Sequence, residues 1–177
     1  MPYCKSLSGV QLHYNNLSGP IPNSLGNLFS VRSLSMSINS FEGSMSEALG
    51  RLKTLIFLSL GLNRLFGKIP KSFYNLSTLL VPTLPYNHLH GNLPTNLGFT
   101  LSNMQVLNIG HNMFTRPPPK SLSNAWNLIE FDINGSNFTR KVEIDCGGLP
   151  GLWWLVLAFK PLGKRRSWWL KLLGFLD

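Results

Sequence analysis

A phrase of about 24 residues recurs along the chain, and an asparagine marks the same point in each copy. Two successive copies read "LSLGLNRLFGKIP" and "PTLPYNHLHGNLP". The steps between marked positions are 24, 24, 24, 25 and 24 residues, and the sixth copy has Ser136 in place of asparagine. Self-similarity at a fixed step is the signature of a stack of like structural units. The marked asparagines are Asn15, Asn39, Asn63, Asn87 and Asn112.

Two apolar residues with one residue between them precede each marked position, as Leu58 and Leu60 precede Asn63. In an extended strand these two side chains share one face, and the residue between them faces the other way. One short strand per copy predicts a parallel sheet, and the copies must stack because none can bury its apolar face alone. We expect each asparagine amide to bond backbone groups of its own turn and of the next copy.

A glycine follows four of the asparagines at the same distance, where a bend needs freedom of φ. In the fifth and sixth copies this column holds Arg116 and Arg140. The single extra residue of the fourth copy lies in "NLGFTLSNM", which we interpret as a surface turn that tolerates an insertion. The glycines are Gly19, Gly43, Gly67 and Gly91.

The consensus L-x-x-L-x-L-x-x-N-x-L-x-G-x-I-P resembles the plant-specific leucine-rich repeat. The resemblance implies an α/β fold, a leucine-rich-repeat solenoid or horseshoe with a parallel β-sheet on the concave face and about seven coils of 24 residues. We predict the repeat array over residues 1–160. A basic and aromatic tail over 161–177 contains "RRSWWLKLLGFL", which is mildly amphipathic and suits a short helix.

Plant proteins with this repeat include the ectodomains of receptor-like kinases and receptor-like proteins, and the polygalacturonase-inhibiting proteins. The resemblance implies a non-enzymatic recognition module of plant cell-surface perception, part of a receptor-like kinase ectodomain, at the outer face of the plasma membrane or in the cell wall. Its partner would be a peptide, a glycan or a protein bound on the concave face, with room for a co-receptor. Two alternatives remain open: an inhibitor of secreted cell-wall hydrolases, and the non-functional product of a truncated receptor gene.

Nothing in the sequence predicts catalysis, a cofactor or a metal site. The four histidines have no motif serine or cysteine beside them, and kinase motifs are absent. The net charge is +9, but seven of the 16 basic residues lie from Arg140 onward and no nucleic-acid motif is present, so we expect no nucleic-acid partner. The longest apolar run is "LWWLVLAF", too short for a membrane helix, and no signal peptide is visible.

The outward residues of the predicted strands are the candidate ligand contacts, since solenoids bind on their concave face. Most are small or polar, and Glu130 and Asp132 form a small acidic patch. The two aromatic members are either interface anchors or isolated exposed residues. The candidates are Arg32, Phe57, Thr83, Asn108, Glu130, Asp132 and Trp154.

Two further features depend on the compartment. The acceptor triplet for N-glycosylation occurs at Asn16, Asn75, Asn134 and Asn137. Cys4 and Cys146 are five coils apart in the predicted stack, about 24 Å at the spacing of strands. A disulfide needs Cα atoms within about 7 Å, so we predict that these two cysteines do not pair.

Overall fold

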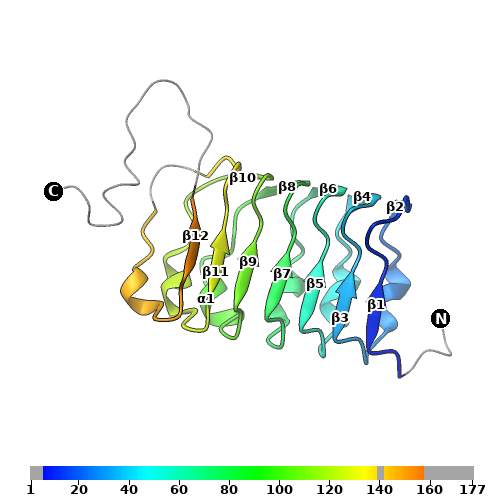
Figure 1. Ribbon diagram of the computed structural model, residues 1–177, viewed down its shortest axis with the longest axis horizontal. Helices are drawn as coiled ribbons and strands as arrows, with labels where there is room; N and C mark the ends of the chain where they lie inside the picture. The colour runs from blue at the N-terminus through cyan, green and yellow to red at the C-terminus, as the bar shows by residue number, and fades with distance from the viewer. Residues whose placement is uncertain (1–5, 139–141, 158–177) are drawn as a thin grey trace.

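A parallel sheet of seven short strands runs along one side of the molecule (Figure 1). The computed structural model describes residues 6–138 and 142–157. Each coil adds one strand beside that of the coil before it, so the predicted solenoid with a parallel concave sheet is confirmed. The strands, in spatial order, are β1 (Gly9–Gln11), β3 (Ser33–Ser35), β5 (Phe57–Ser59), β7 (Val81–Thr83), β9 (Val106–Asn108), β11 (Glu130–Asp132) and β12 (Trp154–Val156).

A second parallel sheet of five strands follows the turn at the marked asparagines. The glycine of each bend has a positive φ, 82° at Gly19 and 98° at Gly91, as the sequence predicts. Arg116 occupies the same column in the fifth coil and keeps a positive φ of 64°. The strands are β2 (Ser18–Pro20), β4 (Ser40–Ser44), β6 (Arg64–Gly67), β8 (His88–Gly91) and β10 (Met113–Phe114).

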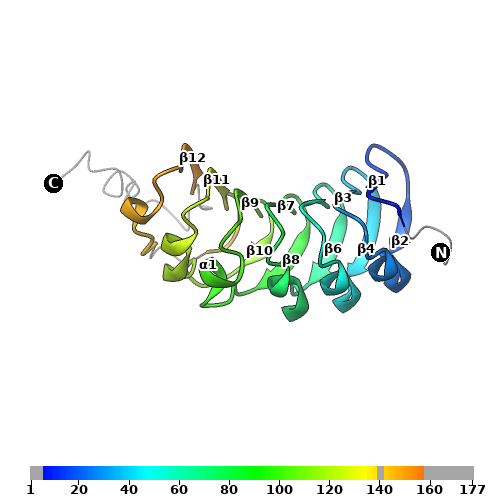
Figure 2. The same cartoon turned by 90° about the horizontal axis from the view of Figure 1, so that it is seen from below.

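Short helices form the outer side of the shallow arc that the coils describe (Figure 2). Most are 3₁₀ turns in which an N–H bonds the carbonyl three residues earlier, as Leu76 N bonds Phe73 O at 3.1 Å. The fourth coil has the extra residue, and there Leu101 N bonds Leu97 O, four residues earlier, at 3.0 Å. The insertion therefore widens one 3₁₀ turn into an α-turn. The helices are η1 (Asn23–Asn27), η2 (Glu47–Arg51), η3 (Lys71–Asn75), α1 (Leu97–Thr100), η4 (Lys120–Asn124) and η5 (Cys146–Gly148).

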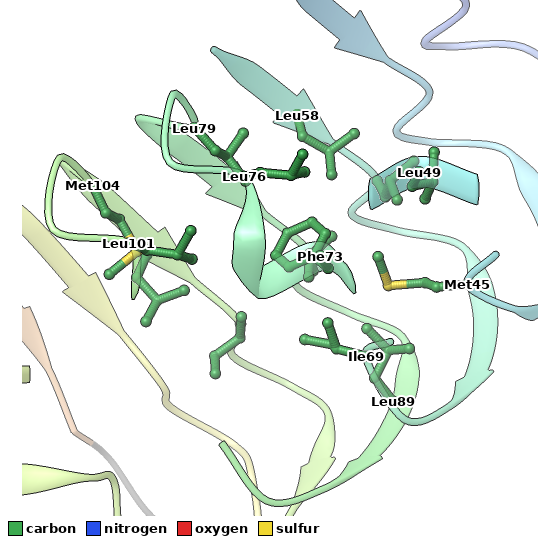
Figure 3. Close-up of a cluster of buried hydrophobic side chains, with 14 of the residues drawn as sticks. Met45, Leu49, Leu58, Ile69, Phe73, Leu76, Leu79, Leu89, Leu101 and Met104 are labelled. Carbon is green, nitrogen blue, oxygen red and sulfur yellow. The ribbon is translucent and has the colours of Figure 1, made fainter. Parts of the chain in front are cut away.

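The core is a continuous column of leucines between the first sheet and the short helices (Figure 3). Leu58 and Leu60 of the third coil are fully buried, and so are Leu76 and Leu79, which follow its helix. In Figure 3, Phe73 points inward from η3, toward the side of Met45 in the preceding coil. No coil encloses this interior alone, which is why stacking is a condition of folding.

The marked asparagines join neighbouring coils. Asn63 is buried, and its Nδ2 donates to Leu60 O in its own turn and to Met36 O in the preceding coil, each at 3.0 Å. Its Oδ1 accepts from Phe41 N, also in the preceding coil, at 3.0 Å. The expectation of bonds to the next coil was wrong in direction: the amide reaches back. Asn87 and Asn112 repeat the arrangement and are buried, whereas Asn39 is half-buried and Asn15 is exposed.

Two departures from the repeat weaken the regular pairing. Pro82 is buried in β7 and has no N–H, and β7 and β9 are paired only at Thr83 and Asn108. Ser136 replaces an asparagine, and the oxygen of its shorter side chain accepts from Asn112 N at 3.3 Å. The predicted tail over 161–177 and the position of Cys4 lie outside the described residues, so the boundary at residue 160 and the absence of a Cys4–Cys146 disulfide stay predictions.

Candidate functional site

The outward residues of the first sheet form rows that cross the strands, because the 24-residue step keeps neighbouring strands in register. Ser59 is paired with Thr83, Thr83 with Asn108, and Asn108 with Asp132. Equivalent positions of successive strands thus carry polar side chains, and all of them except the buried Ser35 are at least partly exposed. We call this set the polar row: Gln11, Ser35, Ser59, Thr83, Asn108 and Asp132.

A more apolar row lies two residues earlier on the same strands. Phe57 is paired with Val81, and Val106 with Glu130. Glu130 is in turn paired with Trp154, whose side chain is 53% exposed at the last described strand. Glu130 and Asp132, two apart on β11, therefore face the same side of the sheet.

The structure brings some of the predicted contact residues together and separates others. Thr83, Asn108 and Asp132 occupy three adjacent strands and form one continuous surface. Arg32 precedes β3, whose residues in the two rows are Ser33 and Ser35, so Arg32 belongs to neither row. Four strand intervals separate β3 from β11, so Arg32 is remote from the acidic patch.

The polar row has a structural role that the sequence pattern did not reveal. Asn108 Oδ1 accepts from Gly110 N at 3.3 Å, and Asp132 Oδ1 accepts from Asn134 N at 2.9 Å. These bonds turn the chain out of the strand, as Asx turns do. They also fix the direction of both side chains, so the polar row is organised before any ligand arrives.

A third row was missed by the sequence interpretation. The residue directly before each marked asparagine has a positive φ, from 50° at His111 to 56° at Ile38. Left-handed backbone at a residue with a side chain costs about 1 kcal/mol or more. The sharp turn that delivers the asparagine to its carbonyl partners imposes this conformation. We call this set the αL row: Tyr14, Ile38, Leu62, Tyr86 and His111.

Several side chains of the αL row are large and exposed. Leu62 is 48% exposed and Tyr86 is 50% exposed. The Tyr86 and His111 rings stack with centroids 4.1 Å apart and planes 8° apart. A Cβ at Gly135, the next position of the row, would lie 2.6 Å from His111 Nδ1, so the imidazole packs closely on that glycine. Tyr86, His111 and Gly135 thus form a flat platform beside the polar row.

The predicted glycosylation positions differ in accessibility. Asn16, Asn75 and Asn137 are exposed, whereas Asn134 is half-buried at the end of β11. The hydroxyl of Ser136, third residue of the Asn134 triplet, is buried against Asn112 N. Of the four triplets, the one beside the concave face is therefore the least accessible in the folded chain.

Cys146 lies at the start of η5, and partial burial and then the charge of Asp145 raise the pKa of its thiol. A raised pKa leaves less thiolate at neutral pH, so we expect slow alkylation by iodoacetamide at pH 7 and faster alkylation as the pH rises. Asp145→Asn keeps a side chain that accepts from Gly147 N but removes the charge, and should speed the reaction at pH 7. Peptide mapping by mass spectrometry measures this, and equal rates in the two proteins would contradict the assigned influence of Asp145.

The described residues contain no group of three or more side chains suited to a metal ion. Helices there have at most five residues, and none is long or apolar enough to cross a membrane.

The geometry defines a class: a leucine-rich-repeat solenoid with two parallel sheets and a series of asparagines that join neighbouring coils. The sequence profile of the Leucine Rich Repeat family matches residues 6–28 and 103–125. A comparison with curated protein sequences found no match.

Solved structures are similar over most of the chain. The ectodomain of the receptor kinase SOBIR1 from Arabidopsis thaliana is 30% identical, with a TM-score of 0.69 over 73% of this chain and 70% of that one. The plant peptide hormone receptor RGFR1 in complex with RGF2 is 29% identical, with a TM-score of 0.83 over 86% of this chain and 24% of that one. The Arabidopsis receptor kinase HAESA, in complex with the peptide hormone IDA and the co-receptor SERK1, is 32% identical, with a TM-score of 0.66 over 75% of this chain and 22% of that one.

This chain belongs to the leucine-rich-repeat family, and within it to the group that includes the ectodomains of plant receptor kinases. It spans about a quarter of the length of RGFR1 and of HAESA in those structures.

Proposed function

We propose that the chain is a non-enzymatic recognition module that binds an extended peptide on its concave face. The observation that carries this proposal is the continuous polar row beside the αL row, described above over β5 to β11. It provides hydrogen-bonding side chains along one line and apolar or aromatic side chains along the next.

The polar row suits the backbone of an extended peptide. The Asn108 amide offers donors, and Asp132 offers acceptors, so carbonyl and N–H groups of a peptide both find partners. The Thr83 hydroxyl donates to Leu58 O at 3.3 Å, so its oxygen is left as an acceptor. Because Asn108 and Asp132 are already held by their own turns, little side-chain entropy is lost on binding.

The flanking rows suit the side chains of such a peptide. The stacked pair of Tyr86 and His111 presents a flat surface, and Phe57 lies in the more apolar row on the other side of the polar row. Aromatic residues commonly anchor interfaces because they bury much surface for few rotatable bonds. We therefore propose a peptide as the partner on this face, in place of the glycan that the sequence also left open.

The related structures support the wider setting of the proposal. RGFR1 and HAESA are described in complexes with a peptide hormone, and HAESA also with a co-receptor. We infer the same setting for this chain: perception at the outer face of the plasma membrane or in the cell wall, with a co-receptor as second partner.

The test is a selection of peptides on the purified chain, followed by affinity measurement. A synthetic library of 12-residue peptides serves as probe, and the affinity of each selected peptide is measured by calorimetry. We expect Asp132→Asn, which can still accept from Asn134 N, to weaken binding of selected basic peptides about tenfold through loss of charge. Phe57→Ala should weaken peptides with an apolar residue by a similar factor.

Lys53→Ala is the matched control, since Lys53 is exposed near the short helices. It should leave every affinity unchanged. Binding that depends on Lys53 and ignores both Asp132 and Phe57 would contradict the concave site.

A further inference from the structure

A second concave region lies away from the concave sheet, where the second sheet leads into the short helices. It is a groove of about 710 Å³. Its walls come from the segments after β6, β8 and β10, from η3 and the beginning of η4, and from Glu143 of the sixth coil, so it crosses four successive coils. The strands that precede these segments, β6, β8 and β10, belong to the second sheet.

Positive charge dominates the lining of this groove. Lys68, Lys71, Arg116 and Lys120 line it, against one carboxylate, that of Glu143. Lys120 Nζ lies 2.6 Å from Glu143 Oε2, which leaves three cations without an acidic partner among residues 6–138 and 142–157. Three unneutralised cations around one groove create a positive potential that attracts an anion.

Arg116 stands out by its backbone. Four coils place glycine in its column, each with a positive φ between 82° and 98°, and Arg116 keeps a positive φ of 64° there. An L-residue in this region is strained, and strain that persists is a reason to look for a function of the side chain. Asn92 holds the arginine side chain in place. When the Asn92 amide is oriented so that its nitrogen donates to Thr115, its oxygen accepts from Arg116 Nε at 3.3 Å.

Lys68 is also held toward the groove. A Cβ at Gly91 would lie 3.1 Å from Lys68 Cγ, so the lysine stem crosses the backbone of the next coil over that glycine. Gly91 thereby gives the lysine stem room to extend from the third coil to the fourth.

The remaining lining determines the kind of anion. Pro94, Pro117, Pro118 and Pro119 have no N–H, so this wall cannot pair with a peptide strand as a sheet edge does. Lysine and arginine are donors only. Tyr74 adds an aromatic ring and a hydroxyl that is neutral at pH 7, and burial raises its pKa further. A donor-rich groove with flat apolar walls suits a ligand that is rich in acceptors and has C–H faces.

We propose that this groove binds a short acidic oligosaccharide, with carboxylate or sulfate groups on Lys68, Lys71 and Arg116. The sugar rings lie against the prolines and Tyr74, and neutral hydroxyls meet Asn92 and Thr95. A peptide backbone fits less well, since its N–H groups would find few acceptors there. The site is separate from the proposed peptide site and does not depend on it.

Calorimetry with hexagalacturonate, a carboxylated sugar oligomer, tests the proposal on the full chain at about 50 mM NaCl, where screening is weak. Arg116→Gly restores the glycine of the other coils, so we expect the melting temperature to hold or rise while affinity falls about tenfold. Lys68→Gln with Lys71→Gln should have an equal or larger effect. Glu143→Gln should tighten binding about threefold, because it frees Lys120 from its ion pair with Glu143.

Arg64→Gln is the matched control, because Arg64 is an exposed cation on β6 outside the groove. It should change the affinity less than about twofold. Methyl-esterified hexagalacturonate, which has the same rings without charge, should not bind.

A sulfated galactan hexamer in parallel identifies the charged group, and loss of its binding in Arg116→Gly supports the proposal equally. Hexaglutamate binding more tightly than both sugars would overturn the proposal in favour of an acidic peptide. Equal binding of the charged and esterified sugars, or an Arg64→Gln effect as large as that of Arg116→Gly, would also overturn it.

Discussion

Replacing Asn63 with alanine is expected to lower the free energy of unfolding by about 3 kcal/mol. The amide shares its two hydrogens among Met36 O, Leu60 O and Gly61 O, and its oxygen accepts from Phe41 N. Alanine leaves these buried backbone groups without partners, at a cost of about 1–3 kcal/mol for each group that water cannot reach. The substitution also acts at a junction between two coils, and the stability of a solenoid depends on such junctions.

Asn96→Ala is the control for this experiment. Asn96 is exposed, and its side chain makes no capping bond to α1. Urea unfolding followed by circular dichroism should leave the Asn96→Ala midpoint close to that of the parent chain. Equal midpoints for the two variants would contradict the role assigned to the asparagines.

The second large effect is expected at Gly98, where local and packing arguments have opposite signs. Gly98 lies in α1, and helix propensity alone favours alanine there by about 1 kcal/mol. A Cβ at Gly98 would, however, overlap the backbone carbonyl of Ser121 in the next coil. Backbone cannot rotate away as a side chain does, so the coils must separate, and we expect a net loss of about 3 kcal/mol.

Gly9→Ala is the control for the overlap argument, because it adds the same methyl group where there is space for it. Gly9 is in β1, and a Cβ added there would have nothing within 4 Å, so this substitution should not destabilise the chain. Thermal unfolding of both variants measures the difference. A Gly98→Ala variant as stable as the parent would mean that the contact between α1 and η4 is looser than the structure has it.

The sequence was sufficient for the strands and for the order of the coils, because both depend on a periodic pattern. Leu58, Leu60 and Asn63 recur at one step, and that same step sets the register between neighbouring strands. Thr83, Asn108 and Asp132 could therefore be assigned to one face before their adjacency was known. The sequence did not show which of these side chains also bonds its own turn. That depends on whether the backbone N–H two residues later points back at the side chain, as it does at Asn108 and Asp132.

Features that depend on a single residue were harder to predict. The extra residue in the fourth coil was interpreted as a loop insertion, yet it forms an α-turn because one more residue allows a bond to the fourth carbonyl back. The αL row was missed because tyrosine, isoleucine and leucine rarely adopt a positive φ, and only the tight turn before the asparagine forces them to. The basic groove was missed because its lining comes from four coils, and side-chain directions there are set by three-dimensional packing.

The regular register of the first sheet also fixes the distance between equivalent side chains of successive coils. Neighbouring strands lie about 4.8 Å apart, so every second coil repeats at about 9.6 Å. A peptide in the polyproline II conformation brings side chains i and i+3 to the same face at about 9.3 Å. The two periods nearly coincide, whereas the two-residue period of a β-strand, about 6.6 Å, matches no whole number of coils. A polyproline II ligand lying across the strands would therefore present residues i and i+3 in turn to Thr83 and Asp132, which are two coils apart.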